Sequence, residues 1–224
     1  MLRQKISDKM RGILQIYGTS KIKQRLWDDD FTHGRWERID KTPGDCIYPR
    51  IEKAANGGSI LDLGCGSGNT ANELAVDMYR DYTGVDISSA AIAKAQKRTE
   101  ANCRAHKTSF LQSDIDNYVP DRQFDVILFR ESIYYIRRAK IQAILERYSE
   151  WLTPEGVFIV KIWHGRKKGK GIVDIIKNRF EVIEEYWPEQ TESVLLVFRG
   201  NAHRAAVALG VSPQVQIESG ASVQ

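Results

Sequence analysis

The chain has 224 residues, of which 42% are hydrophobic and 28% are charged, and its formal net charge is +4. This length accommodates one α/β domain with an N-terminal extension and argues against two full domains. No apolar run is long enough to span a bilayer, the three cysteines show no pairing pattern, and the first twenty residues do not resemble a signal peptide. We therefore expect a soluble protein in a reducing cytoplasm, and the mild basic charge is only weak support for a nucleic-acid partner.

Residues 1–27 carry apolar side chains at near-helical spacing, with basic side chains on the other faces. The pattern predicts one amphipathic helix. Such a helix can pack on the domain for stability, rest on a partner or cover a binding site. Its apolar stripe is short, which disfavours a membrane-surface role.

Residues 28–36 mix three acids with a histidine and aromatic residues. Acidic runs are usually solvated turns or helix caps, so we expect no metal here. His33 is a candidate general base because imidazole titrates near neutral pH, although a loop histidine can equally be an exposed residue. Trp36 either stacks on a ligand or anchors the segment.

The segment 59–70 is the organising feature of the sequence. A short apolar run at Ile60–Leu63 breaks into three glycines at alternate positions, Gly64, Gly66 and Gly68. Glycines permit a tight turn and close backbone approach to a ligand. A helix beginning between Ser67 and Asn69 would direct free N–H groups into that turn, so the pattern predicts a small-molecule site.

The glycine spacing differs from that of a dinucleotide-binding loop. Counted from Gly64, the sixth position is Asn69 and the third glycine comes one residue early, which disfavours a nicotinamide enzyme. The next apolar run, Tyr82–Ile87, carries Asp86 near its end, where a ribose diol would lie.

The rest of the chain alternates strand-like and helix-like segments, which is typical of a doubly wound parallel sheet. The expected helices are 48–56, 70–79, 90–105, 141–151 and 172–180. The expected strands after Asp86 are 108–112, 124–130, 157–163, 180–187 and 193–199, with a turn at 152–156. A basic loop at 164–171 either attracts an anion or is simply solvated. Residues 200–224 show no periodicity and are expected to be loosely ordered.

The order of these motifs resembles the class I S-adenosylmethionine-dependent methyltransferases of the small-molecule type. The motifs are, in chain order, an Asp62-containing strand, a Gly-x-Gly-x-Gly turn, a strand ending at Asp86, an acid at Asp114 and a Phe-Asp-hydrophobic strand at 124–130. The resemblance covers roughly residues 60–198. It implies a Rossmann-like, mostly parallel seven-stranded sheet with an antiparallel last strand. It further implies an N-terminal helical lid at 1–47, a cofactor domain at 48–199 and a tail at 200–224.

The resemblance also implies roles for individual residues. Gly64, Gly66 and the Cys65 backbone would face the methionine part of the cofactor, while Asp86 would hold the ribose hydroxyls. The remaining expected cofactor-binding residues are Ile87 on the adenine, Asp114 beside its amino group, and Asp62, Ile115 and Phe129 around them.

The expected catalytic residues come from three segments. Glu131 would hold the cofactor ammonium or orient the acceptor, although a first-turn helix acid is the alternative. Tyr134 would shape the pocket or else pack in the core. His33 and His164 are candidate bases.

The predicted reaction is direct displacement of the sulfonium methyl group by an oxygen or nitrogen of a small acceptor. Charge is neutralised in that step, so alignment and exclusion of water can suffice, with a base needed only where the acceptor must lose a proton. No Asn-Pro-Pro-Tyr or Pro-Cys motif is present. The alternative is a methyltransferase acting on RNA or protein through the 166–170 loop and the basic N-terminal helix. A non-catalytic binding protein is disfavoured because the ligand-binding pattern is intact.

Overall fold

A computed structural model describes residues 8–37, 42–163, 169–189 and 191–200. Its centre is a seven-stranded sheet in the order β3-β2-β1-β4-β5-β7-β6, in which β7 runs antiparallel to both of its neighbours. The strands are β1 (Ser59–Leu63), β2 (Asp81–Asp86), β3 (Thr108–Gln112), β4 (Phe124–Arg130), β5 (Leu152–Ile162), β6 (Glu181–Tyr186) and β7 (Val194–Arg199). The predicted mostly parallel sheet with an antiparallel last strand is confirmed.

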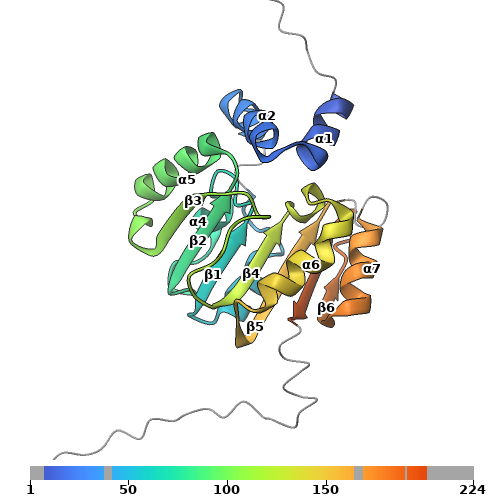
Figure 1. Cartoon of the computed structure of the whole chain (residues 1–224). Coiled ribbons are helices and arrows are strands. Elements are labelled where there is room, and N and C mark those ends of the chain that lie inside the picture. The colour runs from blue at the N-terminus through green and yellow to red at the C-terminus, as the bar shows by residue number, and fades with distance from the viewer. Residues whose placement is uncertain (1–7, 38–41, 164–168, 190, 201–224) are drawn as a thin grey trace, which may run out of the picture.

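Helices cover both faces of this sheet (Figure 1). They are α1 (Asp8–Tyr17), α2 (Ser20–Thr32), α3 (Tyr48–Ala55), α4 (Asn69–Glu73), α5 (Ser89–Ala101), α6 (Arg138–Ser149) and α7 (Lys170–Arg179). One core cluster joins the sheet to α6 and α7, and the other joins it to α3, α4 and α5. Strand β1 is buried along its whole length between them, as its apolar sequence predicts. Among the described residues, no helix combines the length and apolar character needed to cross a membrane.

The parallel strands bring their carboxyl ends to one edge of the sheet. Pairing of β1 with β2 and β4, and of β2 with β3, places Leu63, Asp86, Gln112 and Arg130 along that edge. In open α/β sheets ligands bind at this edge, where the strand order reverses. Helices α1 and α2 lie beside the same end of the sheet (Figure 1).

The N-terminal segment forms two helices rather than the single helix predicted. Gly18 ends α1 with a bond from its N–H to the Leu14 carbonyl (2.9 Å), and Thr19 caps α2 by accepting from Ile22 N–H. A Cβ at Gly18 would overlap the Leu14 carbonyl oxygen, so only glycine fits this break. The break lets α1 and α2 pack against each other, which a continuous amphipathic helix cannot do.

The acidic triplet is part of α2 and not a solvated turn. Asp30 is 3% exposed and accepts from Gln15 (2.8 Å) and Arg11 (2.8 Å) of α1. Asp28 accepts from the Ser88 hydroxyl (2.8 Å) and from Ala90 N–H (3.1 Å) at the start of α5. Two of the acids therefore fix α2 to its neighbours, and no group of three or more metal-ligating side chains occurs in the described part of the chain.

Two other expectations need correction. The helix expected at 70–79 is only Asn69–Glu73, because Arg104 donates to the Ala71 (3.0 Å) and Leu74 carbonyls (2.6 Å) and so satisfies the acceptors at its end. The turn expected at 152–156 lies within β5, where the pairing with β4 is irregular between Phe124 and Val126. The prediction of a loose tail concerns residues that, from 201 onward, lie outside the described part.

Candidate functional site

A cavity of about 690 Å³ lies at the carboxyl ends of the central strands. Its floor is the glycine turn and the ends of β2, β4 and β5, and residues of α1 and α2 contribute its cover. Six aromatic side chains line it: Trp27, Phe31, Trp36, Tyr134, Tyr135 and Trp163. The arrangement encloses a largely apolar space with polar groups at its floor, which is typical of small-molecule sites.

The glycine turn allows the backbone itself to form part of the cavity. Gly64 and Gly66 adopt φ of +84° and +54°, which L side chains rarely adopt. A Cβ at Gly64 would overlap the Cβ of Ser132, whose hydroxyl donates to the Leu63 carbonyl (2.5 Å). The Cys65 side chain is 7% exposed and burial raises the pKa of its thiol. Cys65 thus presents mainly its backbone to the cavity.

Asp86 is fixed beside this turn at the end of β2. Its carboxylate accepts from the Gly66 N–H (2.9 Å) and the Ser88 N–H (2.9 Å). Burial raises the pKa of Asp86 to about 6, and those two N–H groups limit the rise. Asp86 is therefore a pre-oriented hydrogen-bond acceptor at the cavity wall.

The residues predicted to surround an adenosine come together across β2 and β3. Ile87, Asp114 and Ile115 line the same cavity as Asp86. Asp114 accepts from the hydroxyl of Ser20 (2.6 Å), which ties the start of α2 to this end of the cavity. Adjacent parallel strands explain this convergence, because their carboxyl ends lie side by side.

Three predicted site residues lie elsewhere. Asp62 is buried beneath the turn and accepts from the hydroxyl of Tyr82 instead of lining the cavity. Burial raises its pKa to about 6. Phe129 is fully buried in the core and meets Tyr148 edge-on with ring centroids 6.3 Å apart, because alternate strand residues point to opposite faces. His33 is the C-cap residue of α2, and the Nδ1 atom of its exposed ring lies 2.9 Å from the Asp29 carbonyl oxygen. His164 lies outside the described residues.

Glu131 and Tyr134 do line the cavity. Glu131 has φ of +57°, and its carboxylate accepts from the Trp163 N–H (2.7 Å) and the Tyr134 hydroxyl (3.2 Å). Burial raises the pKa of both groups. The Tyr134 ring lies 4.8 Å from that of Tyr135, which in turn meets Trp27 edge-on at 4.7 Å. The pair therefore connects the end of β4 to the aromatic cover contributed by α2.

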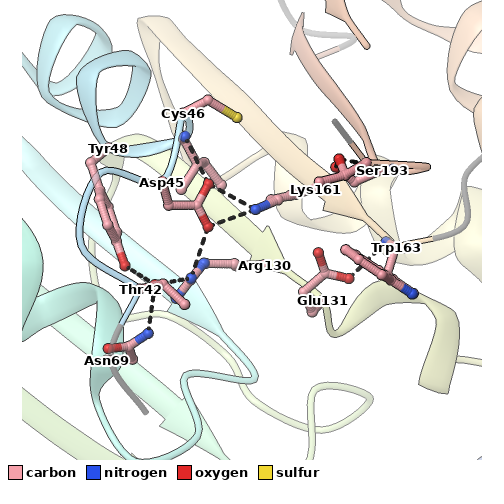
Figure 2. Close-up of polar contacts among 12 residues, drawn as sticks. Thr42, Asp45, Cys46, Tyr48, Asn69, Arg130, Glu131, Lys161, Trp163 and Ser193 are labelled. Carbon is pink, nitrogen blue, oxygen red and sulfur yellow. Dashed lines mark hydrogen bonds and ion pairs between the residues drawn. The ribbon is translucent and has the colours of Figure 1, made fainter. Parts of the chain in front are cut away.

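A second polar group at the cavity was not predicted as a site (Figure 2). Lys161 at the end of β5 contacts both Asp45 oxygens (2.7 and 2.6 Å), and Arg130 at the end of β4 donates to Asp45 (3.0 Å) and to Thr42 (2.7 Å). Burial opposes ionisation of Asp45, but these two cations outweigh it and lower its pKa. The sequence signal was a basic residue at the end of each of two neighbouring strands; the position of Asp45 depends on tertiary packing.

Comparison with known proteins identifies relatives of this fold. Residues 60–156 match a family model described as a methyltransferase domain. The ubiquinone biosynthesis O-methyltransferase of Rickettsia prowazekii is 27% identical over 151 residues, which cover 66% of this chain and 58% of that protein. O-methyltransferase rstn1 of Aspergillus nomiae is 30% identical over 136 residues, covering 58% of this chain and 55% of rstn1. The chain thus spans about three fifths of the curated relatives it matches.

Among solved structures, the N-methyltransferase NodS from Bradyrhizobium japonicum WM9, in complex with S-adenosyl-L-homocysteine, superposes with a TM-score of 0.63. The two share 18% sequence identity, and the match covers 79% of this chain and 97% of NodS. At this identity the likeness establishes the fold alone.

Proposed function

We propose that this chain is a class I S-adenosylmethionine-dependent methyltransferase and that it transfers the cofactor's methyl group to an oxygen or nitrogen of a small-molecule acceptor; its methyltransferase-domain match and its relatives support this. The observation that carries this proposal is the convergence of Gly64, Gly66, Asp86 and Asp114 on one cavity at the carboxyl edge of the sheet. The curated relatives supply the class of reaction, since they are named O-methyltransferases.

The cavity fits the cofactor's adenosine part. The Asp86 carboxylate retains acceptor capacity after its two backbone bonds, and a ribose diol offers two donors. Ile87 and Ile115 provide apolar surface for the adenine, and Asp114 offers an acceptor for its amino group. The positive φ angles of Gly64 and Gly66 bring the backbone of the turn to the wall of the cavity. Asp62 lies beneath the glycine turn, where it accepts from the Tyr82 hydroxyl. We propose that it stabilises its strand and does not contact the cofactor.

Bound S-adenosylmethionine supplies a methyl group already activated by its sulfonium. The protein's task is then to align the acceptor and exclude water. The aromatic residues of α2 and of the segment after β4 enclose the cavity, and aromatic faces also favour a cation. Tyr134 stays protonated because burial raises its pKa further, so we propose Tyr134 as a positioning group and not as a catalytic base. Glu131 is held by the Trp163 N–H and the Tyr134 hydroxyl, and we propose that it positions the ligand as well.

Helices α1 and α2 are proposed as a lid of the cofactor domain. Gln15, Trp27 and Phe31 line the cavity from these helices, while Ser20 and Asp28 fasten α2 to the loop after β3 and the start of α5. A small acceptor would enter beneath this cover. The aromatic lining favours a planar or largely apolar acceptor over a strongly hydrated one.

The RNA or protein alternative depends on basic side chains of the N-terminal helices and of the basic loop, of which Lys21 and Arg25 are exposed on α2. Residues 164–168 of the basic loop are outside the described part. In the N-terminal helix, Arg11 is engaged internally by Asp29 (2.8 Å) and Asp30 (2.8 Å), so it does not contribute to a basic surface. That alternative and the expected cytoplasmic location remain predictions.

The test is the fate of a labelled methyl group. The purified protein would be incubated with methyl-labelled S-adenosylmethionine and, separately, the small-molecule, RNA and protein fractions of a cell extract. We expect label in a small-molecule product and none with Asp86→Asn, while Asp174→Asn, at an exposed position on α7, behaves as the native protein. Enzyme-dependent label in RNA or protein alone would overturn the assignment of the acceptor class.

A further inference from the structure

Exposed apolar side chains lie on the outer surface of the two N-terminal helices. On α1, Met10, Ile13 and Tyr17 are 51%, 43% and 59% exposed, and their spacing places them on one face of the helix. Ile22 in the first turn of α2 is 39% exposed. A Cβ placed at Gly18 would come within 3.1 Å of the Ile22 side chain, so Ile22 continues this face past Tyr17. Met10, Ile13, Tyr17 and Ile22 are here called the apolar stripe.

The apolar stripe faces away from the rest of the protein. The opposite side of α1 carries Gln15 and Arg11, which bind Asp30 of α2 (2.8 Å each). Gln15 also lines the cavity, together with Trp27 and Phe31 of α2. Helices α1 and α2 are the outermost described elements at this end of the sheet (Figure 1). The same two helices therefore cover the cavity with one face and present an apolar surface to the surroundings with the other.

Basic side chains border the apolar stripe. Lys9 is exposed on α1, where helical spacing places it beside the stripe, and Lys21 and Arg25 are exposed on α2. These three side chains form no ion pair within the part of the chain that the structure describes. Arg137, the N-cap of α6, donates to the Tyr17 carbonyl (3.0 Å), and its guanidinium lies 5.8 Å from the centre of the Tyr17 ring. The stripe is therefore bordered by cations from three helices.

The acids of the two helices are engaged by other groups. Asp8 pairs with Arg35 (3.1 Å), and Asp29 pairs with Arg11 (2.8 Å). Asp28 accepts hydrogen bonds at the start of α5, on the side of α2 that faces the sheet. These contacts leave the cations beside the apolar stripe available to an anionic partner.

The partner must match both the charge and the apolar character of this surface. Helices that lie in a membrane interface combine an apolar face, which enters the headgroup boundary, with Lys and Arg side chains that meet anionic lipids. An RNA would use the cations but would leave the aliphatic side chains in water. The stripe of α1 alone is short, which is why the sequence disfavours a membrane-surface role. The structure extends it with Ile22 of α2 and places Arg137 of α6 beside it.

We propose that the outer surface of α1 and α2 binds reversibly to anionic lipid membranes. The apolar stripe enters the headgroup boundary, and the cations that meet the lipid phosphates are Lys9, Lys21, Arg25 and Arg137. Binding in this orientation places the aromatic cover of the cavity next to the membrane, so an apolar acceptor dissolved in the lipid reaches the cavity over a short path. Membrane binding does not require the cofactor, so this inference stands or falls independently of the proposed function.

The experiment is sedimentation of the full-length protein with sucrose-loaded phosphatidylcholine vesicles that contain or lack phosphatidylglycerol. Binding should be at least about tenfold stronger to the anionic vesicles and should weaken as salt is added, because salt screens the cations. Ile13→Gln and Tyr17→Gln should each weaken binding by roughly fivefold, since each removes apolar surface from the interface. Lys21→Gln and Arg25→Gln should have a similar effect, at roughly fivefold per charge.

Two matched controls remove the same kinds of side chain elsewhere. Val119→Gln changes a residue that is 65% exposed between β3 and β4, and Lys97→Gln changes an exposed residue of α5. Both should bind vesicles as the native protein does. Thermal melting checks that every variant folds, and binding of S-adenosylhomocysteine without vesicles should be unchanged in Tyr17→Gln because Tyr17 does not line the cavity.

Three results would overturn the proposal. The first is failure of the native protein to bind anionic vesicles, or an equal loss of binding in the controls. The second is a dimer in equilibrium sedimentation that Tyr17→Gln dissociates, which would assign the apolar stripe to a second copy of the chain. The third is tighter binding to single-stranded RNA than to vesicles, weakened by Lys21→Gln and unaffected by Tyr17→Gln, which would assign the surface to a nucleic acid.

Discussion

Asp62 offers a quantitative test of how burial shapes this site. Its carboxyl accepts from Tyr82 deep beneath the glycine turn, and burial raises its pKa from 3.8 to about 6. Below about pH 3 the group is protonated in both the folded and the unfolded chain. As the pH rises above about 3, the unfolded carboxyl ionises first, so the native state loses stability; the loss is complete at about pH 7, once the folded carboxyl has ionised as well. A difference of roughly two pKa units corresponds to about 3 kcal/mol.

The substitution Asp62→Asn removes this titration while keeping an oxygen that can accept from Tyr82. The stability of the variant relative to the native protein should therefore rise by about 2 kcal/mol between pH 4.5 and 7.5. In the variant an amide NH2 replaces the second carboxyl oxygen, Oδ1 of Asp62, which has no hydrogen-bond partner among the described residues. Leaving these buried N–H groups unpaired costs about 1–3 kcal/mol at every pH. Because this cost is the same at every pH, it does not change how the stability difference between the two proteins varies with pH.

Urea unfolding of both proteins across this pH range measures the difference directly. Asp174→Asn, exposed on α7, is the matched control and should show a flat difference. A stability difference between Asp62→Asn and the native protein that is constant with pH, or that falls as the pH rises, would refute the reasoning.

Three further predictions concern the turn, the proposed lid and the exposed His33. Gly64→Ala should destabilise the protein by about 1–3 kcal/mol in thermal denaturation, because φ is +84° and the added methyl overlaps Ser132; an unchanged melting temperature would contradict this. Asp28→Ala removes the α2 acceptor for Ser88 and Ala90, so limited proteolysis within the first 37 residues should accelerate by about tenfold, and equal rates would mean that α2 is held otherwise. His33→Ala should leave kcat and its pH profile unchanged, since the ring is exposed and bonded to the Asp29 carbonyl; a large loss would place His33 in the reaction.

The sequence was most informative where local patterns are decisive. The third and fourth strands begin and end where predicted, at Thr108–Gln112 and Phe124–Arg130, because their apolar runs are bounded by polar residues. The helix expected from residue 90 begins one residue earlier, at Ser89, with Ser88 as its N-cap; a serine before an alanine-rich helix favours that geometry. These features are determined by a few consecutive residues, so the sequence alone predicts them.

The features that were missed depend on contacts between distant residues. The end of α4 is set by Arg104, thirty residues further along, and the break at Gly18 matters because α1 then packs on α2. Asp45 joins Lys161 across 116 positions, which no local pattern reveals. The position of Phe129 near the end of a strand predicts a place at the cavity, but strand alternation directs its side chain into the core.

The most direct test of the central claim is a calorimetric titration of the native protein and of Asp86→Asn with S-adenosylhomocysteine. The account predicts that the native protein binds and that the substitution weakens binding by at least about tenfold, because it removes a buried charged acceptor fixed by Gly66 and Ser88. Absence of binding by the native protein, or equal affinity in the two proteins, would contradict the account of this cavity.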